Sequence, residues 1–312
     1  MITRIISAVL ALAAAAAVTA AAFRFGGETP RPHLTRSPSL PASPLASAPS
    51  RVAGIVTNDL TTFDRVCGCR PGVAVHYVHW GHSITESTTL ARIMLRDGSE
   101  PLLELEPFGV PPASIAAGNH DTYLNELAEA VRRLHAPVLM SFAPEANGNW
   151  YESWGYHHVP AASVIAAWRH VVTVFRRDGA SNTTWVWVVA SSYPGSEPLT
   201  ALWPGAAYVD EVGIDSYFLS PHDTFRSVFG PTIAAIRHIT ADPVLITETA
   251  ASPAAGKTRV LTQLTSGVAQ YKLTGFVWFD INQAGKHGKA NWVIDNDHAA
   301  LAAFRTAVRT YR

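Results

Sequence analysis

The chain has 312 residues, enough for one large domain or two of ordinary size with a sizeable core. Charged residues make up 15% of it, and 24 Lys and Arg balance 24 Asp and Glu, so the formal net charge is zero. No basic stripe supplies the clustered positive charge that nucleic-acid binding requires, so we expect no nucleic-acid partner. Two cysteines are too few for a disulfide scaffold or a cysteine-rich metal site.

The first 50 residues are expected to lie outside the folded domain. Residues 1–23 contain an apolar run from Ile5 to Phe23 with small residues near its end, which predicts an export signal. Because roughly 20 apolar residues can cross a bilayer, an uncleaved N-terminal membrane anchor is the alternative. Residues 24–50 are rich in proline and serine, a composition typical of a linker. We therefore expect a secreted or membrane-anchored extracellular protein whose folded domain is 51–312.

Within 51–312, short apolar runs alternate with longer stretches of helical spacing. The predicted strands are Ala53–Thr57, Val73–Trp80, Pro101–Phe108, Val138–Pro144, Thr184–Ala190, Val209–Tyr217, Val244–Glu248 and Gly275–Ile281. The predicted helices are Leu90–Leu95, Tyr123–Leu134, Ala161–Arg176, Thr224–Ile239, Arg259–Tyr271 and Ala299–Val308. Such alternation gives a barrel or a doubly wound sheet, and the glycine-rich turn usual after the first strand of a doubly wound sheet is missing. The pattern predicts an α/β protein with one (β/α)8 TIM barrel.

Two glutamates stand where predicted strands open into loops, at the end of the barrel that carries the active site in such folds. Glu145 follows the fourth strand and Glu248 ends the seventh. A carboxylate placed directly after buried apolar residues is costly unless it is solvated, paired or functional. The fourth and seventh strands face each other across the barrel mouth, and two carboxyl groups about 5–5.5 Å apart are what a retaining glycosidase requires. The alternative is a pair of rim carboxylates salt-bridged to Arg or Lys.

Several segments carry a resemblance to a known family. FAPEANGNWYESWG, VDEVGIDSYF, VLITETA, GFVWFD and NWVIDNDHAALAAF occur in the order seen in glycoside hydrolase family 26, and HYVHWG and LLELEPF fit the same pattern. The resemblance implies a retaining β-glycanase in which Glu145 is the acid/base and Glu248 the nucleophile. It also implies that Tyr217 hydrogen-bonds the nucleophile and that Trp278 lies beneath the sugar at the cleavage point. No cofactor or metal is implied, because the two carboxyl groups supply acid, base and nucleophile.

Three residues depart from the pattern of that family. Pro144 stands where many members have His, Ser141 where they commonly have Arg, and Ala146 where Met is frequent. We expect a secreted endo-β-glycanase that acts as a monomer on a polysaccharide or oligosaccharide, with β-mannan before β-glucan. Because a donor next to the cleaved bond is lost, a glycan-binding barrel with weak or no activity is the alternative.

Aromatic residues and one histidine complete the candidate substrate site. Five aromatic residues fall in loops around the predicted mouth: Trp80, Trp150, Tyr151, Trp154 and Trp292. Exposed tryptophan is costly without a use, so we expect Trp80, Trp150 and Trp154 to bind sugar, and at least two of the five to pack loops together instead. His79 lies near a strand end and is expected to contact the substrate. Asp215 either supports the site or belongs to a structural pair.

Two further groups suggest other chemistry. His76, His79 and His82 are three residues apart, but alternate residues of a strand point to opposite faces. His79 then faces away from His76, and we expect no three-histidine metal site. Cys67 and Cys69 either close a tight disulfide or remain two thiols.

Overall fold

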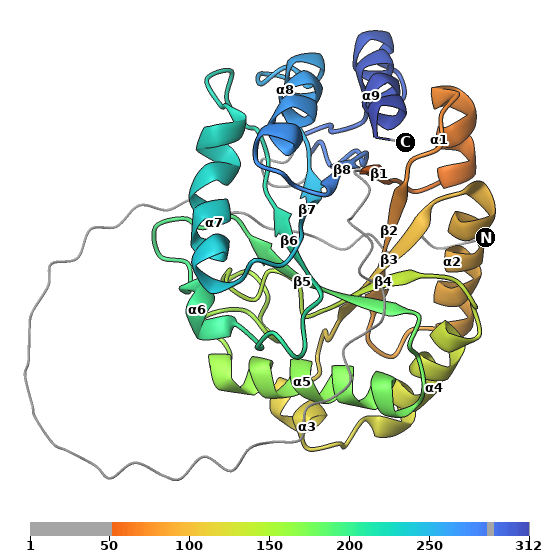
Figure 1. Cartoon of the computed structure of the whole chain (residues 1–312), viewed down its shortest axis with the longest axis vertical. Helices are drawn as coiled ribbons and strands as arrows, with labels where there is room; N and C mark the ends of the chain where they lie inside the picture. Colours follow the sequence, from red (N-terminus) through yellow and green to blue (C-terminus); the bar gives the residue numbers. More distant parts are fainter. Residues whose placement is uncertain (1–51, 286–289, 312) are drawn as a thin grey trace, which may run out of the picture.

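The computed structural model describes residues 52–285 and 290–311 of the chain. The predicted signal or anchor (1–23) and linker (24–50) lie outside these described residues. Eight parallel strands form one closed barrel in chain order, from β1 to β8, and β8 pairs with β1 to close it (Figure 1). This confirms the predicted (β/α)8 barrel.

All eight predicted strands are present, and most boundaries agree within a few residues. The strands are β1 (Val52–Val56), β2 (Val73–His79), β3 (Glu100–Glu106), β4 (Val138–Phe142), β5 (Thr183–Ala190), β6 (Glu211–Asp215), β7 (Val244–Thr249) and β8 (Gly275–Phe279). β4 ends two residues earlier than predicted because the backbone turns to a left-handed conformation at Ala143, with φ of 47°. A residue in that conformation cannot continue a pleated strand.

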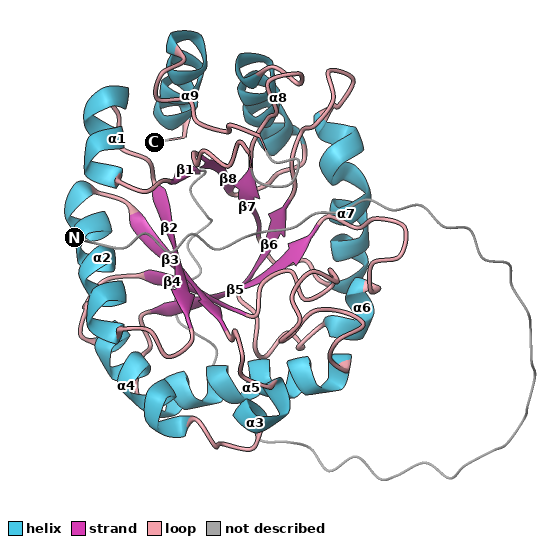
Figure 2. Cartoon of the chain, turned by 180° about the vertical axis from the view of Figure 1, so that it is seen from behind, coloured by secondary structure: helices cyan, strands magenta, loops and turns pink. Residues whose placement is uncertain are grey.

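Helices surround the barrel, as the ring of ribbons around the strands shows (Figure 2). They are α1 (Leu60–Cys67), α2 (Ile84–Asp97), α3 (Pro112–Ala116), α4 (Asp121–Arg132), α5 (Ala161–Arg177), α6 (Leu199–Leu202), α7 (Phe225–Ile239), α8 (Lys257–Gln270) and α9 (His298–Thr310). The predictions missed α1, α3 and α6, which have eight, five and four residues. Such short helices carry too few turns for a clear apolar period. In the described part of the chain, no helix has the length and apolar character needed to cross a membrane.

The longest helix, α5, shows how the outer layer is attached to the barrel. Its buried residues recur at helical spacing: Val164, Ala167, Trp168, Val171, Val172, Val174 and Phe175. Each such apolar side chain stabilises the fold by roughly 1.5–3 kcal/mol when fully buried. The strands approach closely beneath the helices, and a Cβ added at Gly213 of β6 would lie 2.6 Å from Thr247 Oγ1 of β7. Glycine at 213 is therefore required by the contact between β6 and β7.

Strand pairing differs around the barrel. β2 pairs with β3 along its full length, from Val73 opposite Glu100 to His79 opposite Glu106. By contrast, β1 pairs with β2 only at Ile55 and Ala74. The β1–β2 seam is therefore the weakly paired part of the barrel wall.

Candidate active site

Five buried carboxyl groups among the described residues lie toward the C-terminal ends of β3, β4, β6 and β7, which form the mouth of the barrel: Glu104, Glu106, Glu145, Asp215 and Glu248. Burial, followed by the charges of neighbouring carboxylates, raises the pKa of Glu104 and of Asp215 well above the usual range. The same causes raise the pKa of Glu106 to about 8. Buried acids with a raised pKa, as these three are, are typical of functional clefts.

Glu248 is held by two tyrosines. The phenol of Tyr77 on β2 donates a hydrogen bond to Oε2 of Glu248, and the phenol of Tyr217 after β6 donates one to Oε1. Burial, and then the charge of Glu248, raises the pKa of both phenols well above the usual value, so both remain donors. Sequence reasoning identified Tyr217 and missed Tyr77. The available signal was strand alternation, which puts Tyr77 on the same inward face as His79.

Glu145 lies in the loop after β4, and two aromatic side chains of the same loop contact its carboxyl group. Its Oε2 accepts hydrogen bonds from Trp150 Nε1 at 2.9 Å and from Tyr151 OH at 3.3 Å. The backbone of Glu145 is left-handed, with φ of 55°. Non-glycine residues rarely adopt this conformation, and such strain is concentrated at active sites.

A buried asparagine fixes the loop that carries Glu145. Asn147 is fully buried, and its side chain donates to the carbonyl of Ala190 and accepts from the amide of Ala190, both at 2.9 Å. The end of β5 thereby anchors the loop in a single position. Sequence reasoning did not single out Asn147, since an asparagine between an alanine and a glycine is equally typical of an exposed turn.

One of the three departures from the family pattern, Ser141, places a buried hydroxyl group in the barrel wall. Ser141 is opposite Glu104 in the register of β3 and β4. The Oγ atom of Ser141 is buried and has no hydrogen-bond partner among the described residues.

Asp215 is part of a buried pair. It accepts a hydrogen bond from Thr247 Oγ1 at 2.6 Å, beside the neighbouring Glu248.

Trp80 does not lie where the sequence analysis placed it. Its ring packs against His120 and Tyr123 at the start of α4 and against Phe142 of β4. The physical reason is alternation: because His79 points inward, the next residue points outward to the helix layer. The expectation that Trp80 binds sugar at the mouth is therefore not supported by its position.

The other predicted aromatic residues divide into one partly accessible ring and several that pack loops. Trp150 is partly exposed and stacks with Tyr193 at a centroid distance of 6.0 Å. Trp154 is fully buried and donates to the carbonyl of Pro144, so it supports the Glu145 loop and presents no free face. Tyr151 and Trp292 are also buried.

Trp278 is covered by the segment that follows β8. It is fully buried, and its indole N–H donates to the carbonyl of Trp292 at 3.1 Å. The ring of Trp292 in turn lies 4.9 Å from that of Tyr217. Contact between Trp278 and a sugar therefore stays a prediction.

His79 points into the mouth beside Glu106. Its Nδ1 lies 3.1 Å from Glu106 Oε2, without the geometry of a hydrogen bond. Burial and the neighbouring His82 lower the pKa of His79, and burial lowers the pKa of His76 to about 4. Across residues 52–285 and 290–311, no group of three or more His, Cys, Asp or Glu side chains is placed to hold a metal ion.

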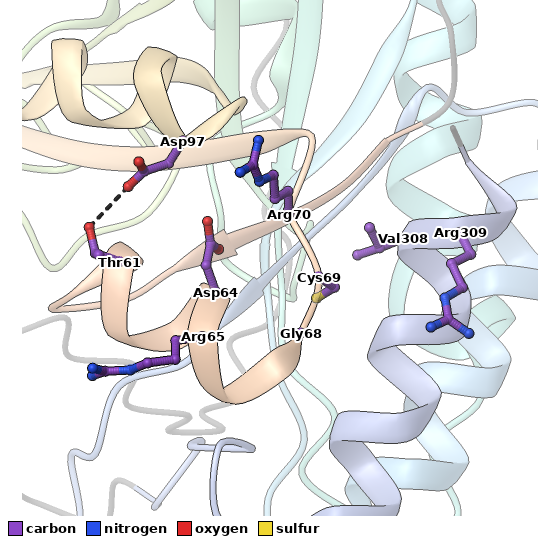
Figure 3. Close-up of a pocket in the computed structure, with 9 residues that line it drawn as sticks. All are labelled: Thr61, Asp64, Arg65, Gly68, Cys69, Arg70, Asp97, Val308 and Arg309. Atoms are coloured by element: carbon purple, nitrogen blue, oxygen red, sulfur yellow. Dashed lines mark hydrogen bonds between the residues drawn. The ribbon is translucent and has the colours of Figure 1, made fainter.

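The two cysteines lie away from the carboxyl groups. Cys67, the last residue of α1, forms a disulfide with Cys69 just beyond the helix. Cys69 lines a cavity of about 470 Å³, which also contacts the ends of α2 and α9 through Asp97 and Arg309 (Figure 3). This cavity includes none of the five mouth carboxyl groups.

Comparison with known proteins identifies the family. A family model described as Glycosyl hydrolase family 26 matches residues 113–284, which is more than half of the chain. The chain belongs to this family. The matched segment contains β4 to β8 and therefore both Glu145 and Glu248, whereas Tyr77 and His79 precede it.

Two curated proteins and one solved structure show the similarity to individual proteins. Endoglucanase H of Acetivibrio thermocellus is 26% identical over 264 residues, covering 80% of this chain and 29% of the relative. Mannan endo-1,4-beta-mannosidase A and B of Caldalkalibacillus mannanilyticus is 32% identical over 108 residues, covering 32% of this chain and 20% of the relative. The chain thus spans less than a third of either curated relative. The β-mannanase BoMan26A of Bacteroides ovatus has the same fold, with a TM-score of 0.62 and 15% identity over 84% of this chain and 89% of that one.

Proposed function

We propose that this chain is a retaining endo-β-glycanase, with Glu145 as the acid/base and Glu248 as the nucleophile. The observation that carries the proposal is that two carboxyl groups at the same end of the barrel, one in the loop after β4 and one on β7, have different hydrogen-bond partners. Both oxygens of Glu248 accept phenol hydrogen bonds, whereas Oε2 of Glu145 accepts from Trp150 and Tyr151. Two acids in different surroundings are what the division between nucleophile and proton donor requires.

In the first step, Glu248 attacks the anomeric carbon while the bond to the leaving oxygen breaks. The two phenol donors favour the ionised form of Glu248, which is the nucleophilic form. Glu145 gives its proton to the leaving oxygen, which departs as a neutral hydroxyl.

In the second step, water releases the sugar from Glu248. Glu145 is now a carboxylate and takes a proton from the attacking water. The new bond from water forms on the face that the departed group occupied, the bond to Glu248 breaks, and Glu248 returns as a carboxylate. The configuration at the anomeric carbon is therefore retained.

The substrate we propose is a neutral β-linked polysaccharide. Glu106 has a pKa of about 8, so it is largely uncharged at neutral pH. An uncharged carboxyl group does not attract a charged sugar, whereas it can hydrogen-bond the hydroxyl groups of a neutral one. The relative whose alignment covers 80% of the chain is an endoglucanase, and the one whose alignment covers 32% is a mannosidase. These comparisons support β-glucan at least as strongly as the β-mannan favoured by the sequence motifs.

We also propose that the protein acts outside the cell, exported through residues 1–23. The support is the apolar run Ile5–Phe23 and the proline- and serine-rich segment behind it. N-terminal sequencing of protein recovered from culture medium and from the membrane fraction tests this. A soluble form starting after residue 23 indicates cleavage, and a membrane-bound form retaining it indicates an anchor.

The test of the catalytic assignment is hydrolysis of β-mannan, mixed-linkage β-glucan and β-1,3-xylan by the wild type, Glu145→Ala and Glu248→Ala. We expect one glycan to be cut and both variants to lose activity, Glu145→Ala by roughly 10²–10⁴-fold. Proton NMR of the first sugar released should show the β-anomer. If a glycan is bound but not cleaved, the protein is a glycan-binding barrel and not an enzyme. If activity survives in Glu248→Ala, Glu248 is not the nucleophile.

A further inference from the structure

One buried glutamate of the barrel wall has no part in the two steps described above. Glu104 lies on β3, between Tyr77 of β2 and Ser141 of β4 in the strand register. Tyr77 points into the barrel, because its phenol reaches Glu248. Residues paired in the register of neighbouring parallel strands point to the same side of the sheet. Glu104 therefore also points into the barrel, at the level of Tyr77, and it is buried there.

The surroundings of Glu104 are acidic. Its two neighbours in the register, Tyr77 and Ser141, offer a phenol and a hydroxyl group, neither of which carries a positive charge. The ionisable groups whose charges act together with that of Glu104 come from β2, β3, the loop after β4, β6 and β7, and all are acids: Tyr77, Glu106, Glu145, Tyr151, Asp215 and Glu248. A buried carboxyl group whose neighbours are acids is more stable with its proton than without it.

Solvent does not reach the β4 side of Glu104. Ser141 is fully buried, and its Oγ atom has no hydrogen-bond partner within the part of the chain that the structure describes. Bulk water therefore does not screen a negative charge at Glu104 from this side. After burial, the charge of Glu248 is the main cause that raises the pKa of Glu104. Each of these two carboxyl groups thus opposes ionisation of the other.

Two neighbouring carboxyl groups that hold one proton can place it on either of them. With the proton on Glu104, Glu248 is the carboxylate that the first step requires. With the proton on Glu248, the nucleophile is lost. The phenols of Tyr77 and Tyr217 donate to Glu248 and favour its charged form, so they keep the proton on Glu104.

We propose that Glu104 is a positioning residue for the nucleophile, which stays protonated during turnover and thereby leaves Glu248 as the charged member of the pair. As a neutral acid it also offers a donor and an acceptor beside the oxygen atoms of Tyr77 and Ser141. This inference rests on the proposed function, since Glu104 acts only through Glu248.

Two variants separate the proton of Glu104 from its polarity. Glu104→Gln is neutral and polar at every pH and so copies the protonated side chain, whereas Glu104→Leu is neutral and apolar. The matched controls are Glu100→Gln and Glu100→Leu, because Glu100 is the first residue of the same strand and lies at the opposite end of the barrel from the mouth. Thermal unfolding reports whether each variant is folded.

The first measurement is kcat and KM from about pH 4 to about pH 9 on the glycan that the wild type cleaves. We expect Glu104→Gln to keep kcat within about twofold and to leave the midpoint of the acid limb, which reports ionisation of Glu248, unchanged. Glu104→Leu should lower kcat by about 3- to 10-fold at unchanged KM, because Tyr77 and Ser141 lose a polar neighbour. The Glu100 variants should match the wild type in kcat and in the pH midpoint.

Three results would overturn the proposal. An acid limb that moves to lower pH by about one unit in Glu104→Gln would mean that Glu104 is charged in the wild type. A loss of kcat in Glu104→Gln as large as that in Glu104→Leu would mean that the proton is not what matters. Wild-type kcat in folded Glu104→Leu would remove the positioning role.

Carbon NMR of protein with isotope-labelled glutamate carboxyl groups separates failure of this inference from failure of the proposed function. It reads protonation without substrate, and loss of a signal in Glu104→Gln or Glu248→Gln assigns each group. We expect Glu104 to be protonated at neutral pH, and Glu248 to titrate at the same pH in the wild type and in Glu104→Gln. If both hold but the wild type cleaves no glycan, the proposed function falls and the proton assignment stands. If Glu104 is ionised in an enzyme that cleaves, this inference falls alone.

Discussion

Tyr77 and Tyr217 donate hydrogen bonds to opposite oxygens of one carboxylate, that of Glu248. Tyr77 comes from β2 and Tyr217 from the end of β6, so the two phenols approach from different parts of the barrel wall. Two fixed donors restrict rotation of the carboxylate and favour its charged form. In the proposed mechanism, this arrangement aims Glu248 at the anomeric carbon before the substrate arrives.

The two phenols should contribute comparably to turnover. We expect Tyr77→Phe and Tyr217→Phe each to lower kcat by about 10- to 100-fold, because each removes a hydrogen bond to a charged group. KM should change less than kcat, since neither phenol is proposed to bind distant sugar units. Steady-state kinetics on the cleaved glycan measures both. Tyr156→Phe is the control, and wild-type kcat in Tyr77→Phe would contradict the role of Tyr77.

Asn147 should be important for stability. Asn147→Ala leaves the N–H and carbonyl of Ala190 without their side-chain partner in a buried position. We expect a loss of about 2 kcal/mol or more in the free energy of unfolding, and reduced activity because the Glu145 loop is released. Urea unfolding gives the first value. Asn149→Ala, at an exposed position in the same loop, should change it by less than about 0.5 kcal/mol.

Glu106 should make the fold less stable as the pH rises. Its pKa is about 8 in the folded state, against about 4.3 for an unfolded glutamate. Between these values the folded state keeps a proton that the unfolded state has lost, so this group lowers the free energy of unfolding as pH increases. The difference in unfolding free energy between Glu106→Gln and the wild type should therefore change with pH. It should favour the variant more at pH 8 than at pH 5, by more than about 1 kcal/mol.

Urea unfolding of both proteins at the two pH values measures this difference. Glu126→Gln serves as the control because Glu126 is exposed on α4. An offset between wild type and Glu106→Gln that is the same at pH 5 and pH 8 would show that Glu106 does not hold a proton in the folded state.

The disulfide should stabilise the fold only modestly. Cys67 and Cys69 are two residues apart, so the bond closes a loop of three residues. The loop-entropy relation gives about 1.5 kcal/mol for so short a loop, less than for a typical disulfide. Unfolding of the Cys67→Ala/Cys69→Ala protein, and of the wild type with a reducing agent, should show losses of this size. A loss above about 4 kcal/mol in the free energy of unfolding would mean that the disulfide stabilises more of the fold than the turn between Cys67 and Cys69.

The sequence predicted the alternation of strands and helices because buried parallel strands leave continuous apolar runs. It placed Glu145 and Glu248 correctly at strand ends, since each interrupts such a run. It missed Tyr77, which lies inside a strand and differs little in pattern from a buried aromatic residue. The outward orientation of Trp80 was available from alternation, but its position next to the predicted mouth was given more weight.

The sequence by itself determined the closed barrel and which two strands lead to Glu145 and Glu248, because hydrophobic period and strand order are local properties of the chain. Tertiary structure alone decided what those carboxylates contact. Tyr77 precedes Glu248 by 171 positions, and Asn147 precedes Ala190 by 43. The weak β1–β2 seam, paired only at Ile55 and Ala74, likewise depends on how the barrel closes. Contacts between distant segments follow from barrel closure and packing, which no local pattern encodes.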